Sequence, residues 1–397
     1  MLLRFTFGNF RSFRNEQELS LIAGSGSDTE ASFPVPGVKE AILPVCGIYG
    51  ANASGKSNVL KALSFVQEAV LNSHRLWEPS GPIPIQMFKG DSDGTAEFVV
   101  DFVVEAVRYQ LGFKATSMEI AEEWLFSYPN GRKQNLYTRS GPAAITFGRT
   151  LAGDNRTIAS LMRKNSLYLS TAAQNNHEAL RPVYNWFHRS IDFVFERSID
   201  FAGETGSMCR FDEPRQEILD LMRFADLGVV SLRLEDVTGI DPGIRFLHSV
   251  GDKVVEFDPN DESQGTAAYF SLLGPVLTAL KRGAVLAVDE IDSSLHPSLT
   301  AFLVRLFGNK NSNPTAAQLI FSTHDTSLLS DGILKRDQVW FTEKDRVGVS
   351  QLYPLTDFKP RTGENFEKRY LQGRFGAIPF INSERIPGGI NPDAQTR

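Results

Sequence analysis

One glycine-rich segment constrains this chain more than any other feature. Residues 50–57 read Gly-Ala-Asn-Ala-Ser-Gly-Lys-Ser and fit the pattern G-x-x-x-x-G-K-[ST]. An apolar run over 41–49 precedes the segment, and apolar residues at helical spacing over 59–70 follow it. A strand, a tight turn and a helix form the context in which such a turn binds phosphate, because glycines let main-chain N–H groups point inward and the helix N-terminus adds a positive dipole. The sequence therefore predicts a phosphate-binding loop at 50–57.

Two residues of this loop have specific expected tasks. Lys56 is expected to reach the β- and γ-phosphates of a nucleotide, which makes it a catalytic candidate, and the Ser57 hydroxyl is expected to ligate Mg²⁺. The other loop residues predicted to bind the nucleotide are Gly50, Ala51, Asn52, Ala53, Ser54 and Gly55.

An acidic pair and a histidine follow two later apolar runs. Asp289 and Glu290 come directly after 285–288, which predicts a buried strand. We expect Asp289 to hold the magnesium ion, directly or through water, and Glu290 to orient and deprotonate an attacking water. His324 follows the strand predicted over 319–323 and is expected to contact the γ-phosphate or the attacking water; a structural histidine is the alternative.

A second anion site is predicted where a long apolar helix begins. Ser263, Gly265 and Thr266 stand at the start of this helical pattern, where a hydroxyl, a glycine N–H and a helix N-terminus come together. A plain helix cap is the alternative interpretation. Pro275 lies inside the pattern and is expected to kink or interrupt the helix.

Composition places the chain among ordinary globular proteins. Of its 397 residues 42% are hydrophobic and 22% charged, and 41 basic against 47 acidic residues give a net charge of −6. These values exclude disorder and argue against a uniformly basic nucleic-acid coat. Two cysteines exclude a disulfide framework and a cysteine-rich zinc site, and they favour a reducing cytoplasm. The longest apolar stretch, 266–280, is too short for a membrane span, so we expect no membrane segment and no signal peptide.

The first of three predicted domains spans 1–150. Strands are expected over 1–22 and 97–139, and Asn130-Gly131 is typical of a hairpin turn between two of them. This domain is interpreted as an N-terminal lobe that holds the phosphate-binding loop and a β-rich subdomain.

The other two predicted domains are 151–235 and 236–397. The segment 151–235 is interpreted as a mostly helical insertion, within which Arg-Ser-Ile-Asp-Phe occurs at 189–193 and again at 197–201. This offset of even length keeps side chains on one face of a strand and predicts a local β segment. From 236 onward strands and helices alternate in a C-terminal lobe, with a frayed tail expected near the end of the chain.

Taken in this order, the motifs resemble the ATP-binding-cassette (ABC) type of P-loop ATPase, and most closely its RecF/SMC/OLD-like branch. The residues that carry the resemblance are Asn9-Phe10-Arg11-Ser12-Phe13, Lys56-Ser57-Asn58, Asp289-Glu290-Ile291-Asp292-Ser293-Ser294-Leu295-His296-Pro297 and Ser322-Thr323-His324-Asp325. The resemblance implies an α/β head: a mixed sheet flanked by helices, with a β-rich subdomain and an inserted, mostly helical lobe. It places Arg11 near the nucleotide base and Asn58 in the nucleotide site. It also makes Ser263, Gly265 and Thr266 a degenerate signature motif.

The same resemblance implies ATP hydrolysis, with Mg²⁺ as cofactor, in a homodimer that shares its nucleotides. ATP would join two heads, and hydrolysis would release them. One subunit would contribute Lys56, Ser57, Asp289, Glu290 and His324, and the other Ser263 and Gly265. Gln86, within Ile85-Gln86-Met87-Phe88, is the candidate for a glutamine that contacts the metal.

Three further segments, 165–170, 225–228 and 368–379, resemble a bacterial subfamily of stand-alone AAA/ABC ATPases associated with anti-phage defence. This resemblance implies a cytoplasmic sensor or scaffold that regulates a separate effector, a nuclease or toxin encoded nearby. DNA or a phage-derived molecule is the expected trigger. The residues after His324 are too few for an appended nuclease domain, which agrees with a separate partner.

Departures from the ABC pattern argue against other roles. The signature lacks the Leu-Ser-Gly-Gly-Gln form of transporters, and His296 stands where transporters have Asp. Compact-looking sequence, not a coiled coil, separates Lys56 from Ser263. A transporter subunit and an SMC-like tether are therefore disfavoured. Two alternatives stay open: a RecF-like ATPase of DNA repair or recombination, and an ATP-gated binding module with negligible turnover.

Overall fold

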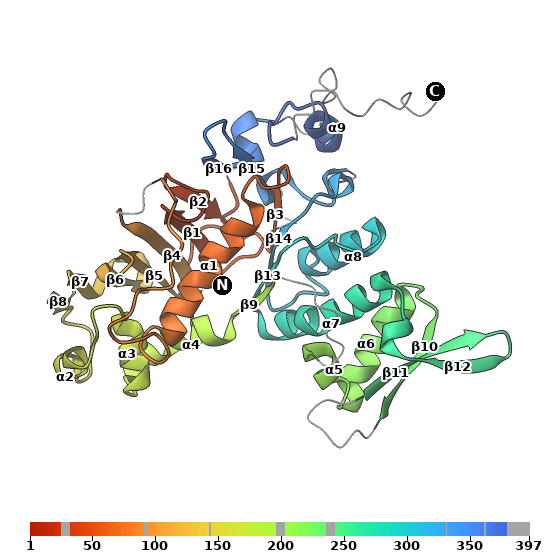
Figure 1. The fold of residues 1–397 in the computed structure, drawn as a ribbon, viewed down its shortest axis with the longest axis horizontal. Helices are drawn as coiled ribbons and strands as arrows, with labels where there is room; N and C mark the ends of the chain where they lie inside the picture. Colours follow the sequence, from red (N-terminus) through yellow and green to blue (C-terminus); the bar gives the residue numbers. More distant parts are fainter. Residues whose placement is uncertain are drawn as a thin grey trace, which may run out of the picture.

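A computed structural model describes residues 1–24, 32–90, 94–142, 144–195, 203–235, 243–330, 332–360 and 363–378 of the chain. Over these ranges the strands form three sheets, and helices pack against them (Figure 1). The predicted α/β class, with sheets flanked by helices, is confirmed. The second copy of the repeated pentapeptide and the expected frayed tail lie outside the described residues.

The largest sheet is antiparallel and has the strand order β2-β1-β4-β5-β6-β7-β8. Its strands are β1 (Leu2–Gly8), β2 (Gln17–Ser20), β4 (Ala96–Val104), β5 (Val107–Ala115), β6 (Ile120–Tyr128), β7 (Gln134–Ser140) and β8 (Ala144–Phe147). Alternate residues of β4, namely Phe98, Val100 and Phe102, are fully buried, as expected for a sheet that packs one face on a core. Asn130 and Gly131 take positive φ angles of 53° and 76° between β6 and β7, which confirms the predicted hairpin.

The second sheet is mixed and has the order β16-β15-β3-β14-β13-β9. Its strands are β3 (Val45–Tyr49), β9 (Ile191–Val194), β13 (Val285–Val288), β14 (Gln318–Ser322), β15 (Val339–Lys344) and β16 (Ser350–Pro354). All neighbours pair in parallel except β15 and β16. Strand β9 confirms the local β segment predicted at 189–193. Because the carboxyl ends of parallel strands meet at one edge, the residues that follow β3, β13 and β14 are brought together.

This mixed sheet separates two hydrophobic cores. Cys46 and Ile48 of β3 belong to the first core, and Val45 and Tyr49 of the same strand belong to the second, because successive side chains of a strand point to opposite faces. Helix α1 (Lys56–Asn72) packs in the first core, and α7 (Gln264–Arg282) and α8 (Pro297–Gly308) pack in the second. The layers place α1 and α7 on opposite faces of the sheet.

The remaining elements divide between these two cores. Helices α2 (Asn155–Ser160), α3 (Tyr168–Gln174) and α4 (Arg181–Arg189) contribute to the first, and α6 (Asp212–Phe224) to the second. The third sheet, β10 (Val229–Glu235), β11 (Gly243–Val250) and β12 (Lys253–Phe257), packs beside α6 (Figure 1). The described helices of 151–235 therefore do not share one core, and the domain limits at 150 and 235 stay predictions.

Helix α7 continues through Pro275 to Arg282, so the interruption expected at this proline does not occur. Pro275 has no N–H to give to the carbonyl of Ser271, one turn earlier. Thr205, on the short helix α5 (Glu204–Met208), replaces that bond: its hydroxyl donates to Ser271 O at 3.1 Å and accepts from Gly274 N–H at 2.8 Å. Gly274 permits the approach, because a Cβ there would lie 2.6 Å from Thr205 N. The hydroxyl of Thr205 thus gives Ser271 O the hydrogen bond that Pro275 cannot donate.

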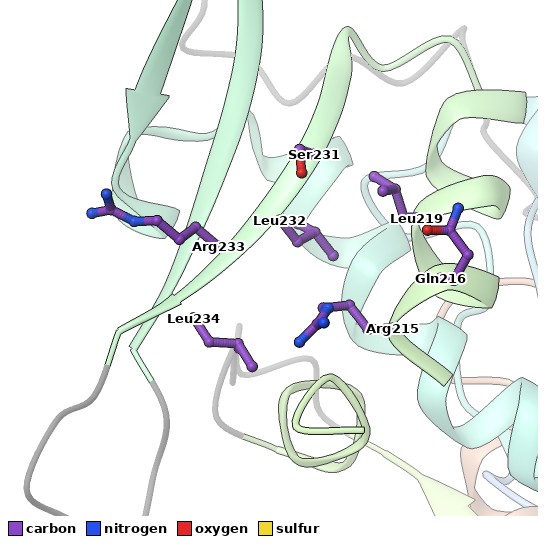
Figure 2. Close-up of a pocket in the computed structure, with 7 residues that line it drawn as sticks. All are labelled: Arg215, Gln216, Leu219, Ser231, Leu232, Arg233 and Leu234. Atoms are coloured by element: carbon purple, nitrogen blue, oxygen red, sulfur yellow. The ribbon is translucent and has the colours of Figure 1, made fainter. Parts of the chain in front are cut away.

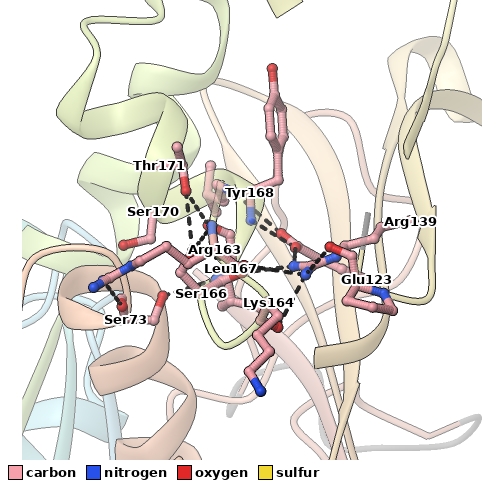
Figure 3. A network of polar contacts seen from close by, with 12 residues as sticks. Ser73, Glu123, Arg139, Arg163, Lys164, Ser166, Leu167, Tyr168, Ser170 and Thr171 are labelled. Carbon is pink, nitrogen blue, oxygen red and sulfur yellow. Dashed lines mark hydrogen bonds and ion pairs between the residues drawn. The ribbon is translucent and has the colours of Figure 1, made fainter. Parts of the chain in front are cut away.

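A buried polar network joins the antiparallel sheet to α3 (Figure 3). Glu123 on β6 accepts hydrogen bonds from Tyr168 N at 2.7 Å and Leu169 N at 3.2 Å, at the start of α3. Arg139 on β7 lies 3.7 Å from Glu123 and donates to Ser166 O at 2.7 Å. Burial raises the pKa of Glu123, and the positive charge of Arg139 opposes that rise. The segment 165–170, singled out in the sequence, is thus held by an internal hydrogen-bond network.

The same segment also holds the far end of α1. The backbone N–H of Leu167 donates to Ser73 Oγ at 3.0 Å, and His74 N–H donates to Ser170 Oγ at 3.1 Å. The Arg163 guanidinium donates to Ser73 O at 2.8 Å. These bonds satisfy backbone groups at the C-terminal end of α1, whose other end begins at the glycine-rich loop.

Candidate functional site

The glycine-rich loop connects β3 to α1, as the sequence predicts. Strand β3 ends at Tyr49 and α1 begins at Lys56. Gly50 and Gly55 have φ angles of 155° and 121°, which favour glycine. A Cβ at Gly50 would lie 2.4 Å from Thr342 O on β15, so the loop also needs a glycine for packing. The predicted strand, turn and helix are all present.

Lys56 lies buried inside this loop. Its ammonium donates hydrogen bonds to Gly50 O at 2.9 Å and Ala51 O at 3.2 Å. Burial lowers the pKa of Lys56 to about 8, although the charges of Glu290 and Asp289 favour the protonated form. A desolvated cation held by carbonyl oxygens is stabilised by an incoming anion, so the side chain suits a phosphate group.

Ser57 and Asp289 meet at the carboxyl edge of the mixed sheet. The Ser57 hydroxyl donates to Asp289 Oδ1 at 3.0 Å. Ser322, the last residue of β14, donates its own hydroxyl to the same oxygen and accepts from Glu290 N–H at 2.7 Å. Hydroxyl and carboxylate oxygens are the ligands that Mg²⁺ prefers, so Ser57 and Asp289 form a donor set of the right chemistry. The role of Ser322 was missed in the sequence, where it appears only as part of a longer motif.

Glu290 turns the chain sharply after β13. Its φ of 50° is left-handed, a conformation that costs a residue with a Cβ about 1–2 kcal/mol. The bond from its N–H to Ser322 holds this turn, and the Glu290 side chain is exposed. Asp289 and Glu290 therefore differ in setting: the carboxylate of Asp289 is held at the loop by two hydroxyl groups, and the side chain of Glu290 is open to solvent.

His324 follows β14 at the same edge. Its backbone N–H donates to Asp292 Oδ2 at 3.3 Å, which ties it to the segment after Glu290. Partial burial and the charge of Lys56 lower the pKa of His324. His296, by contrast, is the N-cap of α8: its Nδ1 accepts from Ser298 N–H at 3.2 Å.

The N-terminal segment adjoins the loop. Ser12 Oγ accepts a hydrogen bond from Asn58 Nδ2 at 2.8 Å. Ser350, at the start of β16, places its hydroxyl 2.8 Å from Ser12 Oγ and 2.6 Å from Ser54 O. Asn58 is thus tied to the N-terminal segment, and its predicted contact with nucleotide stays a prediction. Ser350 had no signal in the sequence, because its contacts join segments far apart in the chain.

Arg11 and Gln86 lie next to each other. Arg11 N–H donates to Gln86 O at 2.7 Å, in the extended segment between α1 and β4. Burial lowers the pKa of Arg11, whose φ of 52° is left-handed. The side chain of Gln86 is exposed. The proposed roles of Arg11 at the base and of Gln86 at the metal stay predictions.

The second predicted anion site opens α7. Ser263 is the N-cap of this helix, with its hydroxyl accepting from Thr266 N–H at 3.1 Å, so the cap expected as the alternative is present. The side chain of Ser263 is exposed. A Cβ at Gly265 would lie 3.1 Å from Ser294 O, which places the start of α7 beside the segment that follows Glu290. An anion-binding role for Ser263, Gly265 and Thr266 stays a prediction.

A separate surface hollow of about 460 Å³ lies between α6 and β10 (Figure 2). The residues that line it are Arg215, Gln216, Leu219, Ser231, Leu232, Arg233 and Leu234. Arg215 donates to Cys209 O at 3.3 Å, and Arg233 pairs with Glu256 at 2.7 Å. Both guanidinium groups already have partners within the chain, so we assign no ligand to this hollow.

The parallel strands, the glycine-rich loop and the serine–aspartate pair at their edge define a nucleotide-binding protein of the P-loop class. The chain belongs to the family described as "AAA domain, putative AbiEii toxin, Type IV TA system", whose model matches residues 45–330. No curated protein matches the chain.

Among solved structures, the chain is similar to heads of SMC proteins. It shares 14% identity with the SMC head domain from Thermotoga maritima, with a TM-score of 0.46 over 89% of this chain and 98% of that one. It shares 16% identity with an SMC head bound to the C-terminal winged-helix domain of ScpA, with a TM-score of 0.49 over 89% and 96%. Across the described parts of the chain, no helix has the length and apolar character needed to span a membrane.

Proposed function

We propose that this protein is a magnesium-dependent ATPase whose two copies clasp ATP between them. One observation carries the proposal: Lys56, Ser57 and Asp289 converge at the carboxyl edge of the mixed sheet, with Glu290 and His324 on the adjoining turns. Their chemistry covers what phosphoryl transfer needs, a cation for the phosphates, oxygen ligands for a metal and a carboxylate for water.

The hydrolytic step follows from these placements. The loop at 50–57 would bind the phosphates through its N–H groups, and Lys56 would contact the β- and γ-phosphates. Bound Mg²⁺ would neutralise developing charge on the phosphate oxygens. Glu290 would accept a proton as water attacks the γ-phosphorus and the bond to the ADP oxygen breaks, which yields ADP and phosphate. His324 would orient the water or the γ-phosphate.

A second copy would complete the site. Ser263 stands exposed at the start of α7, where the first N–H groups of a helix have no partners within the helix. Gly265 adjoins Ser294, so the start of α7 and the segment after Glu290 form one surface. We infer that Ser263, Gly265 and Thr266 of one copy contact the γ-phosphate held by the loop of the other.

We further propose that the dimer is a cytoplasmic sensor or scaffold that regulates a separate effector, a nuclease or toxin, in bacterial anti-phage defence. The family description, which names a toxin of a toxin–antitoxin system, supports a setting of this kind. DNA or a phage-derived molecule is the proposed trigger. ATP binding and release of the dimer would report the trigger to the effector.

The Glu290→Gln variant tests the proposal. A general base typically accelerates a reaction about 10²- to 10⁴-fold, so the turnover rate should fall by a factor in that range. The ATP that is not cleaved should hold two copies together as a dimer, which light scattering detects. Glu217→Gln on α6 is the matched control and should behave as wild type. Equal turnover in Glu290→Gln and wild type would exclude the base role.

A second variant separates binding from dimerisation. Ser263→Arg, introduced with Glu290→Gln, should keep ATP binding to the monomer but abolish the ATP-dependent dimer. An unchanged dimer would contradict a shared site. Tight ATP binding without turnover in wild type would instead favour an ATP-gated binding module. Turnover stimulated by DNA, with a strong dependence on salt, would favour the RecF-like alternative.

A further inference from the structure

Tyr49 is a buried phenol at the end of β3, directly before the phosphate-binding loop. Its side chain is fully buried in the second core, and within the described structure its hydroxyl has no hydrogen-bond partner. A buried hydroxyl without a partner is destabilising, so each one in a native protein requires an explanation. Because Tyr49 directly precedes the phosphate-binding loop, we look for a partner of its hydroxyl beside the nucleotide site.

The segment after His324 lies against Tyr49. Thr323 N–H donates to Ile48 O at 3.1 Å, which sets the end of β14 beside the end of β3. Asp325 uses one carboxylate oxygen to accept from Ser327 N–H at 2.9 Å. Its other oxygen, Oδ2, is buried and has no partner among the described residues. Tyr49 and Asp325 thus each carry a buried polar atom without a partner, a donor and an acceptor, next to the paired ends of β3 and β14.

Electrostatics agrees with this arrangement. Burial raises the pKa of the Tyr49 phenol, and among the charged groups that raise it further Asp325 has the largest effect, followed by Asp292. Asp325 is thus the charged group that acts most strongly on the Tyr49 phenol. Because the pKa is raised, the phenol keeps its proton and can serve as a hydrogen-bond donor.

The C-terminal helix α9 (Phe366–Leu371) forms the wall behind both groups. The Tyr370 ring meets Tyr49 edge-on with centroids 5.9 Å apart, and Tyr370 OH donates to Ala377 O at 3.0 Å. Glu367 accepts from Thr326 Oγ1 at 3.1 Å. Helix α9 is therefore bonded to the residue that follows Asp325, and it limits where the segment can move.

We propose that the Tyr49 hydroxyl donates a hydrogen bond to Asp325 Oδ2 when the His324 segment closes on bound ATP, so that both residues position His324. This inference rests on the ATPase proposed above. The bond forms in the closed state alone, so it shifts the equilibrium toward that state without contacting the nucleotide. Asp325 is the neighbour of His324 in the chain, so a bond that holds its carboxylate restricts the backbone that carries the imidazole.

Tyr49→Phe provides the test. Removing a hydroxyl that lacks a partner should leave the unfolding temperature of the nucleotide-free protein unchanged or higher. The kcat should nevertheless fall about tenfold while KM changes little, because one hydrogen bond of the closed state is lost. Asp325→Asn keeps the oxygen that caps Ser327 and should lose less activity than Asp325→Ala. Tyr269→Phe, a buried tyrosine of α7, is the control and should retain wild-type kcat.

The outcomes separate this inference from the proposed ATPase. If the wild-type protein hydrolyses ATP and Tyr49→Phe hydrolyses it equally fast, the proposed bond between Tyr49 and Asp325 is overturned. The proposed ATPase activity is then still supported. If wild type binds ATP but does not turn it over, the rise in unfolding temperature caused by ATP and Mg²⁺ becomes the measure, and it should shrink in Tyr49→Phe; an equal rise overturns the pairing. Wild type that neither binds nor hydrolyses ATP overturns both proposals.

Discussion

Ser57 on α1 donates a hydrogen bond of 3.0 Å to Asp289 at the end of β13, although 232 positions separate them in the chain. The contact exists because β3 and β13 run parallel on either side of β14 and end at the same edge. It joins the helix that follows the loop to the acidic pair that follows the strand. The metal ligands predicted from two separate motifs are thus in direct contact.

This contact predicts a selective loss of magnesium dependence. Ser57→Ala removes one proposed ligand, but Asp289 keeps its bond to Ser322, so the fold should persist. Mutation of a residue that merely hydrogen-bonds to a metal ligand typically lowers metal affinity about 10- to 100-fold. Loss of a ligand itself should therefore lower the affinity for ATP with Mg²⁺ at least about tenfold. Affinity without Mg²⁺ should change little. Titration calorimetry with and without the metal measures both values, and Ser160→Ala on α2 is the control. An unchanged effect of Mg²⁺ in Ser57→Ala would contradict the assignment.

The lowered pKa of Lys56 predicts that ATP binding takes up a proton at alkaline pH. Without nucleotide the pKa is about 8 instead of 10.5, so Lys56 is largely neutral at pH 9. The phosphates would restore the charged form and raise this pKa, and one proton should be taken up per site near pH 9 and almost none at pH 7. Calorimetry in two buffers of different ionisation enthalpy counts these protons. Lys56→Arg stays charged throughout, and the same uptake in that variant would assign it to another group.

The lowered pKa of Lys56 also predicts how the free energy of unfolding changes with pH. A lysine whose pKa is lower in the folded state is more protonated in the unfolded one between pH 8 and 10.5. The stability of the nucleotide-free protein therefore gains from Lys56 as pH rises through this range, and the penalty is fully present below pH 8.

The hydrogen bonds of the Thr205 hydroxyl beside Pro275 predict a loss of stability in one variant that a second substitution reduces. Thr205→Val leaves Ser271 O and Gly274 N–H without the hydroxyl and should cost about 1–3 kcal/mol in urea unfolding. Thr205→Ser keeps the hydroxyl and should retain most of the stability. Pro275→Ala returns an N–H to the helix, so the cost of Thr205→Val should shrink in that background. An equal cost in both backgrounds would show that the hydroxyl does not serve this helix.

Local patterns were sufficient for several parts of the fold. The strand before the loop, the helix after it, the hairpin at Asn130-Gly131 and the buried strand before Asp289 were all predicted, and the structure confirms them. Each depends on spacing, turn chemistry or an apolar run within about twenty residues. The interruption expected at Pro275 was wrong, because Thr205, a residue remote in sequence, gives Ser271 O the hydrogen bond that the proline cannot.

By itself, the sequence determined which residues are candidates for the site: glycines where the backbone must turn, a lysine and serine at a helix start, and acids after a buried strand. Only the tertiary structure decided which of them meet, and it added Ser322 and Ser350, whose contacts join segments far apart in the chain. The physical reason is that backbone preference acts over a few residues. The order of parallel strands and the burial of each polar group are properties of the packed whole.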